Sequence, residues 1–269
     1  MAGSETHADE RRAGPVDPPR EGPVNQPTIA KAQDQLFAPD KSSRAKYAEL
    51  VVGRPGFGSL LKHELIVMLA QSKAGAFGLV LRKALYPRLL GSCGRNVVFG
   101  QNVVLRHPHK IHIGSNVVID DNCLLDAKGE SNLGIRIGDG VFIGRNTILS
   151  CKNGDIDIGD HANIGFNCEL FSASRVSIGP SVLLAAYTYV IGGDHDFSDP
   201  SIPVLAQTRT SSGINIGEGV WTGAGAMILD GVTIGAHAVI GAGAVVRDPV
   251  PAGAVAVGIP ARIVSTRTP

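Results

Sequence analysis

The residues best suited to acid–base chemistry lie in the segment GGDHDFSDPSIPVLAQTRTSSG, residues 192–213. His195 stands near its start, between two carboxylates, Asp194 and Asp196. A histidine titrates near neutral pH, so its imidazole can take a proton from a hydroxyl group that attacks an electrophile. The two carboxylates are candidates to orient the ring or raise its basicity, although both can equally be solvated. The segment therefore predicts a histidine general base, against the alternative of an ordinary surface histidine.

A regular repeat surrounds this segment and has to position it. Downstream of it, one residue in every six is a large apolar side chain or threonine: Ile216, Thr222, Ile228, Ile234, Ile240 and Val246. Two positions before each stands another aliphatic residue: Ile214, Val220, Ala226, Val232, Ala238 and Ala244. Each hexad therefore predicts a very short strand with two inward side chains. A corner follows it, where glycine permits a close or left-handed backbone.

The repeat also extends upstream, with longer intervals between its anchors. Successive anchors are 24, 21, 20, 38 and 18 residues apart at Ile113, Ile137, Ile158, Ile178, Ile216 and Ile234. Relative to three hexads, the insertions are 6, 3, 2, 20 and 0 residues, and the longest one holds His195. A chain that turns three corners per coil forms a triangular prism of parallel strands, stacked about 4.8 Å apart. A long loop that leaves such a solenoid is a usual place for a functional site.

These hexads resemble those of the hexapeptide-repeat O-acetyltransferases over roughly residues 92–264. The segment around His195 is similar to the histidine-bearing loop of the maltose, galactoside and colanic-acid type enzymes. The resemblance implies an all-β fold, a left-handed parallel β-helix, with His195 as the catalytic base and residues 192–213 as the active-site loop. It also implies acetyl-coenzyme A as co-substrate, a sugar, polysaccharide-precursor or glycolipid hydroxyl as acceptor, and a homotrimer.

The same resemblance indicates where the donor would bind. In those enzymes the pantetheine arm lies in the groove between two prisms of a trimer, beside the last coils. Small corner residues would let the arm approach the backbone, an aromatic residue would give it a flat wall, and arginines would pair with phosphates. The expected donor-binding residues are Trp221, Gly223, Ala224, Gly241, Ala242, Arg247 and Arg262. The alternative interpretations are that Trp221 points outward and covers a strand, and that Arg247 and Arg262 are solvated arginines near the C-terminus.

Direct transfer from a thioester to a hydroxyl needs a base and an oxyanion donor, and glycine-rich corners expose backbone N–H groups. No serine or cysteine nucleophile motif is evident. Two other functions stay open: a zinc hydrase of the γ-carbonic anhydrase type, which needs three converging histidines, and a non-catalytic trimeric scaffold. The histidines concerned are His107, His109 and His112 near the first coil, and the scattered His161, His195 and His237. Only His107 and His112 have a close, metal-like spacing, so we expect no metal.

The chain before the repeat has a different character. Residues 1–40 are rich in proline, glycine and charge and have no apolar h-region, which predicts a disordered tail and no signal peptide. Residues 41–91 predict a helical segment, with Ser59 as a possible N-cap and Pro87 at the end. Lysines and arginines flank the apolar stretches of residues 57–90. This segment is either a helical hairpin packed on the protein or a neighbouring subunit, or a basic segment at a membrane surface.

Composition bears on the fold, the binding partners, the state of the cysteines and the location of the protein. Hydrophobic residues make up 43% of the 269 residues and aromatic residues only 5%, while glycine reaches 34 residues, which suits many short stacked strands. The net charge of +1 gives no indication of nucleic acid. The four cysteines form no CxxC pair, so we expect them to be reduced, buried residues. No run of 18 apolar residues occurs, and we expect a cytoplasmic protein that is either free or peripheral on the inner membrane face.

Overall fold

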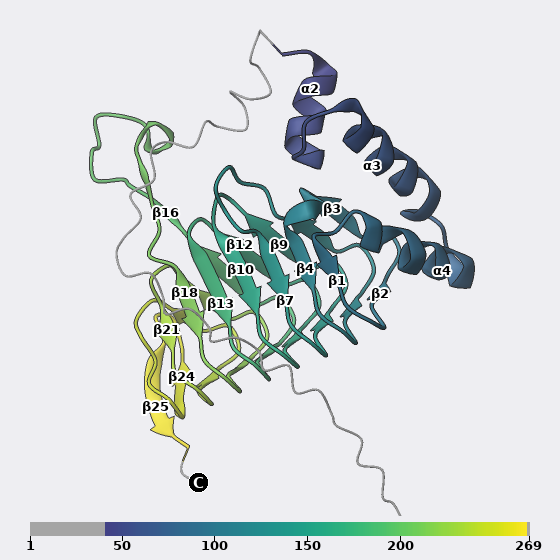
Figure 1. The fold of residues 1–269 in the computed structure, drawn as a ribbon. Helices are drawn as coiled ribbons and strands as arrows, with labels where there is room; N and C mark the ends of the chain where they lie inside the picture. The colour runs from purple at the N-terminus through teal and green to yellow at the C-terminus, as the bar shows by residue number, and fades with distance from the viewer. Residues whose placement is uncertain (1–40, 268–269) are drawn as a thin grey trace, which may run out of the picture.

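The chain forms a parallel β-helix, and the computed structural model describes residues 41–267. Three sheets make the three faces of a prism, and all their strands are parallel except the last strand of the chain, which pairs in antiparallel fashion. The helices lie at the N-terminal end of the prism (Figure 1). The β-helix that the six-residue repeat predicted is therefore confirmed. The predicted disordered tail, residues 1–40, lies outside the described residues.

Each coil contributes one strand to each sheet in turn. The first sheet contains β1 (Ser92–Cys93), β4 (Ile111–Ile113), β7 (Ile135–Ile137), β10 (Asp155–Ile158), β13 (Arg175–Ile178), β18 (Ile214–Ile216) and β21 (Thr233–Ile234). The second contains β2 (Val98–Phe99), β5 (Val118–Ile119), β8 (Phe142–Ile143), β11 (Asn163–Ile164), β14 (Leu183–Leu184), β19 (Trp221–Thr222), β22 (Val239–Ile240), β24 (Ala254–Val257) and β25 (Arg262–Thr266). The third contains β3 (Val104–Arg106), β6 (Leu124–Asp126), β9 (Ile148–Cys151), β12 (Glu169–Ser172), β15 (Tyr189–Gly192), β20 (Met227–Ile228) and β23 (Val245–Val246).

The strand register is the one that the anchor spacing predicted. In the first sheet each anchor pairs with the next, in the order Ile113, Ile137, Ile158, Ile178, Ile216 and Ile234. These side chains point into the prism and are buried, as are the smaller residues two positions before the later anchors. Identical or similar side chains thus stack directly above one another, which gives the interior continuous columns of isoleucine, valine and leucine.

All the insertions leave the prism at one edge, where the third sheet passes into the first. The connections from β6 to β7, β9 to β10, β12 to β13 and β15 to β18 differ in length, while those at the other two edges keep the six-residue step. We call this edge the loop edge. At the other corners the coils approach too closely for extra atoms, since a Cβ on Gly165 would lie 2.8 Å from the Leu184 carbonyl oxygen. The loop edge is therefore where this fold can carry a site.

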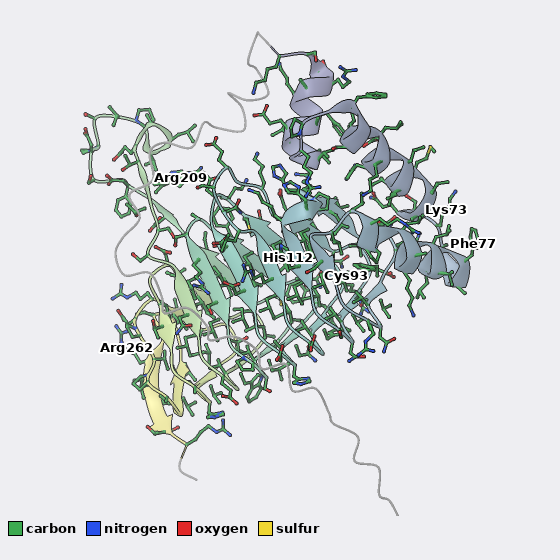
Figure 2. All side chains as sticks on the ribbon, in the orientation of Figure 1. Lys73, Phe77, Cys93, His112, Arg209 and Arg262 are labelled. Carbon is green, nitrogen blue, oxygen red and sulfur yellow. The ribbon has the colours of Figure 1, made fainter. Side chains whose placement is uncertain are left out.

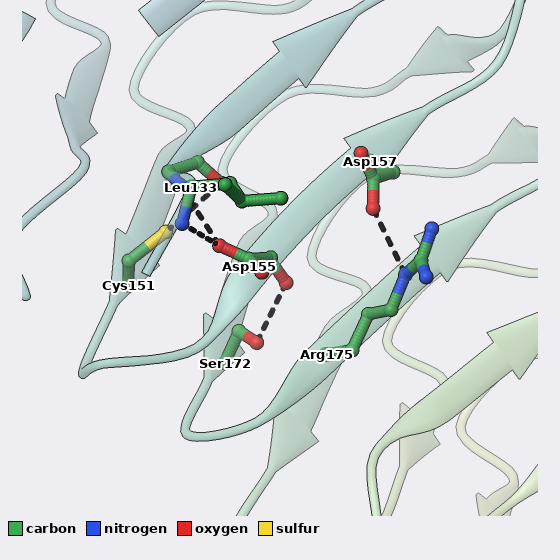
Figure 3. Close-up of polar contacts among 7 residues, drawn as sticks. Leu133, Cys151, Asp155, Asp157, Ser172 and Arg175 are labelled. Carbon is green, nitrogen blue, oxygen red and sulfur yellow. Dashed lines mark hydrogen bonds and ion pairs between the residues drawn. The ribbon is translucent and has the colours of Figure 1, made fainter. Parts of the chain in front are cut away.

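Polar side chains brace the loop edge and the outer side of the first sheet (Figure 3). Asp155 Oδ1 accepts the backbone N–H groups of Leu133 at 2.7 Å and Gly134 at 2.8 Å, and Ser172 Oγ donates to the Asp155 carbonyl at 2.8 Å. On the next strand, Arg175 Nε donates to Asp157 Oδ2 at 3.0 Å. Side chains of one coil thus fix the loops and strands of its neighbours.

Helices cover the N-terminal end of the prism, in agreement with the helical segment that was predicted for residues 41–91. They are α2 (Ser43–Tyr47), the π-helical turn η1 (Ala48–Val52), α3 (Phe57–Ala70), α4 (Gly75–Leu85) and the 3-10 turn η2 (Tyr86–Arg88). The prediction that Ser59 caps the first long helix is wrong, because α3 begins at Phe57 after Gly56. Gly56 has a φ of 101°, which glycine adopts easily, so the chain enters the helix before it reaches the serine.

A buried arginine joins these helices to the first coil. Arg82 of α4 donates to the Phe99 carbonyl at 2.9 Å and to the Ala70 and Lys73 carbonyls at 3.1 and 2.6 Å. The hydroxyl group of Tyr86 donates to the Val103 carbonyl at 2.9 Å, and burial raises the pKa of this phenol to about 12. None of the helices within residues 41–267 is long and apolar enough to cross a membrane.

The cysteines follow their prediction with one exception. Cys123, Cys151 and Cys168 are free and buried, and burial raises the pKa of the Cys123 and Cys168 thiols to about 11. Cys93 is also free but only half-buried, so the prediction of a buried side chain is wrong there. Its strand, β1, is the first of its sheet and has a neighbouring strand on one side only.

The stacked columns predict a large cost for shortening one of their members. Leu170→Ala removes a fully buried side chain from the middle of the third sheet, and we expect a loss of about 2–5 kcal/mol in unfolding free energy. The matched change Leu133→Ala, at an exposed leucine, should cost less than about 0.5 kcal/mol. Urea denaturation followed by circular dichroism measures both, and equal midpoints for the two variants would contradict the columnar core.

Candidate active site

The long insertion folds as a hairpin that projects from the loop edge (Figure 1). Its two arms are β16 (Asp194–His195) and β17 (Arg209–Thr210), which pair in antiparallel fashion so that His195 lies opposite Arg209. Gly213, with a φ of 79°, returns the chain to β18, and a Cβ there would lie 2.7 Å from the Arg175 carbonyl oxygen. The hairpin therefore leaves and rejoins the prism at a fixed place.

A buried glutamine holds the outer part of the hairpin together. Gln207 has only 7% of its surface exposed. Its Nε2 donates to the carbonyls of Asp199 at 2.8 Å and Ile202 at 3.2 Å, while its Oε1 accepts the Asp199 N–H at 3.1 Å. The 3-10 turn η4 (Val204–Ala206) lies between these partners. One side chain thus satisfies the backbone of a loop that has little regular structure of its own.

The root of the hairpin is tied to the following coil by Asp230. Its carboxylate accepts the N–H groups of Ser212 at 2.7 Å and Gly213 at 3.1 Å, and the Ser211 hydroxyl group at 3.1 Å. The Ser211 hydroxyl group also lies 2.7 Å from that of Ser174 in the preceding coil. The root is therefore bonded to the coils on both sides of it.

The imidazole of His195 has one nitrogen shielded from solvent. Nδ1 is buried and has no hydrogen-bond partner within residues 41–267. The residue as a whole is only half-buried. The braced backbone therefore positions the residue, while no side chain within residues 41–267 fixes the tautomer of its ring.

The two flanking carboxylates bond to the backbone. Asp194 Oδ1 accepts the N–H of His195 at 2.7 Å, and Asp196 Oδ1 accepts the N–H of Ser198 at 2.9 Å. Hydrogen bonds from Ser198 lower the pKa of the Asp196 carboxyl group, so this group is ionised at neutral pH. In the described structure neither carboxylate bonds to the ring. Their support of His195 is thus support of the hairpin's backbone.

The expected donor residues lie on other faces of the prism. Trp221, on the second sheet, is 50% exposed and pairs with Leu183 and Val239. The loop edge joins the first and third sheets, so the second sheet is the face opposite to it. A single chain therefore does not bring Trp221 and His195 together.

The four expected corner residues differ in whether their backbone N–H groups make a hydrogen bond. Gly223 and Gly241 donate theirs to the Ile240 and Ala256 carbonyls of the following coil, at 2.7 and 2.8 Å. A Cβ at Gly223 would lie 2.5 Å from the Ala242 nitrogen. These glycines are therefore required for coil stacking and offer no free donor. Among the described residues, the N–H groups of Ala224 and Ala242 make no hydrogen bond.

The two arginines meet at one carboxylate near the end of the chain. Arg262 Nη1 donates to Asp248 Oδ2 at 3.2 Å, and Arg247 Nε lies 3.6 Å from the same oxygen. Both side chains are largely exposed. Figure 2 shows Arg262 near the last strand and Arg209, the hairpin partner of His195, well apart from it. The structure thus brings Arg247 and Arg262 together and separates them from the hairpin that carries His195.

The other histidines belong to the framework. His161 and His237 occupy corner positions between the first and second sheets with φ near 60°, away from the loop edge. His107 bonds through Nε2 to the Glu49 carbonyl at 2.9 Å, and its ring stacks on that of His109. Burial lowers the pKa of His109 to about 4. Within residues 41–267 no three His, Cys, Asp or Glu side chains are grouped to hold a metal ion.

Comparison with known proteins agrees with this fold. The family model of the bacterial transferase hexapeptide (six repeats) matches residues 213–248. A dTDP-4-amino-4,6-dideoxy-D-glucose acyltransferase of Escherichia coli is 34% identical over 177 residues, which are 66% of this chain and 82% of that protein. The chain belongs to the hexapeptide-repeat transferases.

Two further matches differ in how much of each chain they cover. A probable acetyltransferase of Mycobacterium tuberculosis is 34% identical over 133 residues, or 49% of this chain, and the chain spans only 44% of that protein's length. A crystal structure of a variant of AntD, an N-acyltransferase from Bacillus cereus, was solved with dTDP-4-amino-4,6-dideoxyglucose and coenzyme A. It matches with a TM-score of 0.50 and 22% identity, over 74% of this chain and 92% of that one, which supports the fold alone.

Sequence reasoning missed the residues that position the hairpin. Gln207, Ser211 and Asp230 belong to no motif, and Asp230 is in the regular repeat, after the loop. The sequence held one weak indication of the role of Asp230. This residue precedes Gly231 at a corner position that small residues occupy in the neighbouring hexads. Only the stacking of coils reveals that its carboxylate faces the root of the loop.

Removal of the Gln207 amide should loosen the hairpin without unfolding the prism. Gln207→Ala leaves the Asp199 and Ile202 carbonyls without their partner, and an unsatisfied buried group costs about 1–3 kcal/mol. We expect trypsin to cleave after Arg209 about tenfold faster in this variant. Gln101→Ala, which removes a glutamine bonded elsewhere to the Ser72 carbonyl, serves as the control. Equal cleavage rates in both variants would show that Gln207 does not brace the loop.

Proposed function

We propose that this protein is an acetyl-coenzyme A-dependent O-acyltransferase that acetylates a hydroxyl group of a sugar or polysaccharide precursor. The observation that carries the proposal is His195, held on a braced hairpin that interrupts an otherwise regular prism. In this mechanism Nε2 of His195 takes the hydroxyl proton as the oxygen attacks the thioester carbonyl. The new ester bond forms as the carbon–sulfur bond breaks, and coenzyme A leaves as its thiol after taking up the proton.

The developing oxyanion needs a hydrogen-bond donor that is free in the resting protein. The unbonded N–H groups of Ala224 and Ala242 meet this requirement, while those of Gly223 and Gly241 do not. Trp221 would supply an apolar wall for the pantetheine arm, and Arg247 and Arg262 would pair with coenzyme A phosphates. Asp248 balances part of the charge of both arginines, so a phosphate would have to compete with it.

The separation of base and donor residues supports a site shared between protomers. His195 is at the loop edge and Trp221 is on the opposite face, so a second copy has to complete the site. Exposed apolar side chains gather around the edge between the second and third sheets: Phe166, Leu183, Tyr187, Trp221 and Met227. Such a surface fits burial against another prism, and the proposal is a homotrimer.

The chemistry of the acceptor nucleophile separates two candidate reactions. The E. coli relative is named for a dTDP-linked 4-amino sugar, which favours an amino group of a nucleotide-linked sugar as a second candidate acceptor. The resemblance of the His195 segment to O-acetyltransferase loops favours a hydroxyl group. The proposal places the enzyme in the cytoplasm, where a peripheral membrane contact through residues 57–90 would bring it close to lipid-linked sugars.

The function is tested with acetyl-coenzyme A and a panel of free, nucleotide-linked and lipid-linked sugars, with release of coenzyme A as the readout. On the best acceptor, His195→Ala should lower kcat by about 10²–10⁴-fold, the usual contribution of a positioned base. The KM for acetyl-coenzyme A should stay within about twofold, because the proposed donor residues lie on another face.

His161→Asn is the control for this prediction, because His161 is an exposed corner residue with a φ of 60° and asparagine adopts that conformation readily. This variant should keep the wild-type kcat. A His195→Ala enzyme with more than half of the wild-type kcat would remove the base from the hairpin. Transfer only to amino sugars would replace O-acylation by N-acylation.

The shared site predicts the size of the particle. Sedimentation velocity at micromolar concentration should give a species of three 28.0 kDa chains. Leu183→Glu puts a charge beside Trp221 on the proposed contact face and should convert this species to monomer, with loss of activity. Thr233→Glu, at an exposed position of the first sheet, which is the face opposite the proposed contact edge, should leave the trimer intact. A wild-type monomer that is fully active would contradict the shared site.

A further inference from the structure

The two long N-terminal helices carry an apolar surface that no described element covers. The outward side chains of α3 are large and exposed, at Phe57, Leu61, Leu65, Met68 and Leu69. With 3.6 residues per turn they fall in one arc of the helix, opposite the buried His63, Ile66 and Ala70. An ordinary surface helix carries polar residues on its outer side, whereas α3 is apolar on both sides. Its outer side is therefore suited to an apolar environment.

The surface continues onto α4, which packs against α3. Phe77 and Val80 are exposed on its outer side, Phe77 by as much as 70%. Figure 2 shows Phe77 and the neighbouring Lys73 at the periphery of the molecule, away from the strands. We call these outward residues of α3 and α4 the outer helical face. It lies at the N-terminal end of the prism, apart from the hairpin of His195.

Basic side chains surround this face. Residues 57–91 contain five lysines and arginines and one acidic residue, and of the five only Arg82 is buried. The guanidinium of Arg44 lies 5.8 Å from the centre of the Phe57 ring, and that of Arg88 donates to the Ala84 carbonyl. The one acidic residue, Glu64, already accepts a hydrogen bond from the Tyr47 hydroxyl at 2.7 Å. The rim of the face is therefore predominantly positive.

We propose that the outer helical face docks this protein on an anionic lipid bilayer. The apolar side chains enter the boundary between headgroups and acyl chains, while lysines and arginines pair with lipid phosphates at the rim. Charge favours this occupant over a second copy of the chain, because two such faces would oppose their basic rims. The inference does not depend on acyl transfer, since none of its residues belongs to the proposed site.

The experiment uses the full chain with vesicles of phosphatidylcholine alone and of phosphatidylcholine mixed with phosphatidylglycerol. Co-sedimentation should occur with the anionic vesicles only and should weaken as salt is raised. The apolar double variant Met68→Ser, Phe77→Ser should reduce binding at least about tenfold. The charge double variant Lys73→Gln, Lys83→Gln should reduce binding to a similar extent, because each basic residue near an anionic surface raises the affinity about several-fold.

Matched controls change one apolar and one basic residue that lie away from the outer helical face. Leu133→Ser and Lys152→Gln should bind anionic vesicles as the wild type does, and circular dichroism checks that every variant is folded. Absence of binding to anionic vesicles, or binding that the two double variants leave unchanged, overturns the proposal. Sedimentation velocity without lipid provides the third arm: if the apolar variant lowers the oligomeric state, another copy covers the face and the proposal fails. If vesicles bind only after deletion of residues 1–40, those residues occupy the face and docking by the full chain is likewise refuted.

Discussion

Coil-on-coil stacking is the constraint on which the rest of this structure depends. Each strand has only two to five residues, too few to be stable alone, and gains its stability from the strands above and below it. The stacking requires one inward side chain of the same kind at every level, as in the column of Ile178, Ile216 and Ile234. It also brings the corners so close that glycine is needed where a Cβ would meet the next coil, as at Gly165 and Gly223.

The same constraint decides where variation is possible. Two edges of the prism keep the six-residue step, so additional residues have to leave at the loop edge. The long hairpin shows how such an insertion remains ordered without strands of useful length. Its Gln207 satisfies its own backbone, and Asp230 of the next coil anchors its root. The order of the hairpin around His195 thus comes from polar side chains of the hairpin and of the next coil, because its own apolar side chains are mostly exposed.

The geometry also explains why one protomer is an incomplete enzyme in the proposed mechanism. A triangular section puts every edge opposite a face, so residues of one coil can be neighbours in sequence and still point in opposite directions. Ile216 and Trp221 belong to the same coil as the end of the hairpin, yet Trp221 is on the face opposite His195. In that mechanism, an acceptor and a donor bound on such different sides would meet only in a groove between two copies of the chain.

The sequence alone determined the coil, because a six-residue period in side-chain size survives every insertion and directly encodes the register, from Ile113 to Ile234. It also pointed to the hairpin, because the one long break in that period is visible without coordinates. It did not determine the start of α3, where the backbone freedom of Gly56 outweighed the capping preference of Ser59. Nor did it determine what Asp194, Gly223 and Asp230 do, since their bonding depends on residues brought beside them by neighbouring coils and turns. Only the tertiary structure decided those roles, because hydrogen bonds and close contacts depend on distances between atoms, and the sequence period fixes only the order of the faces.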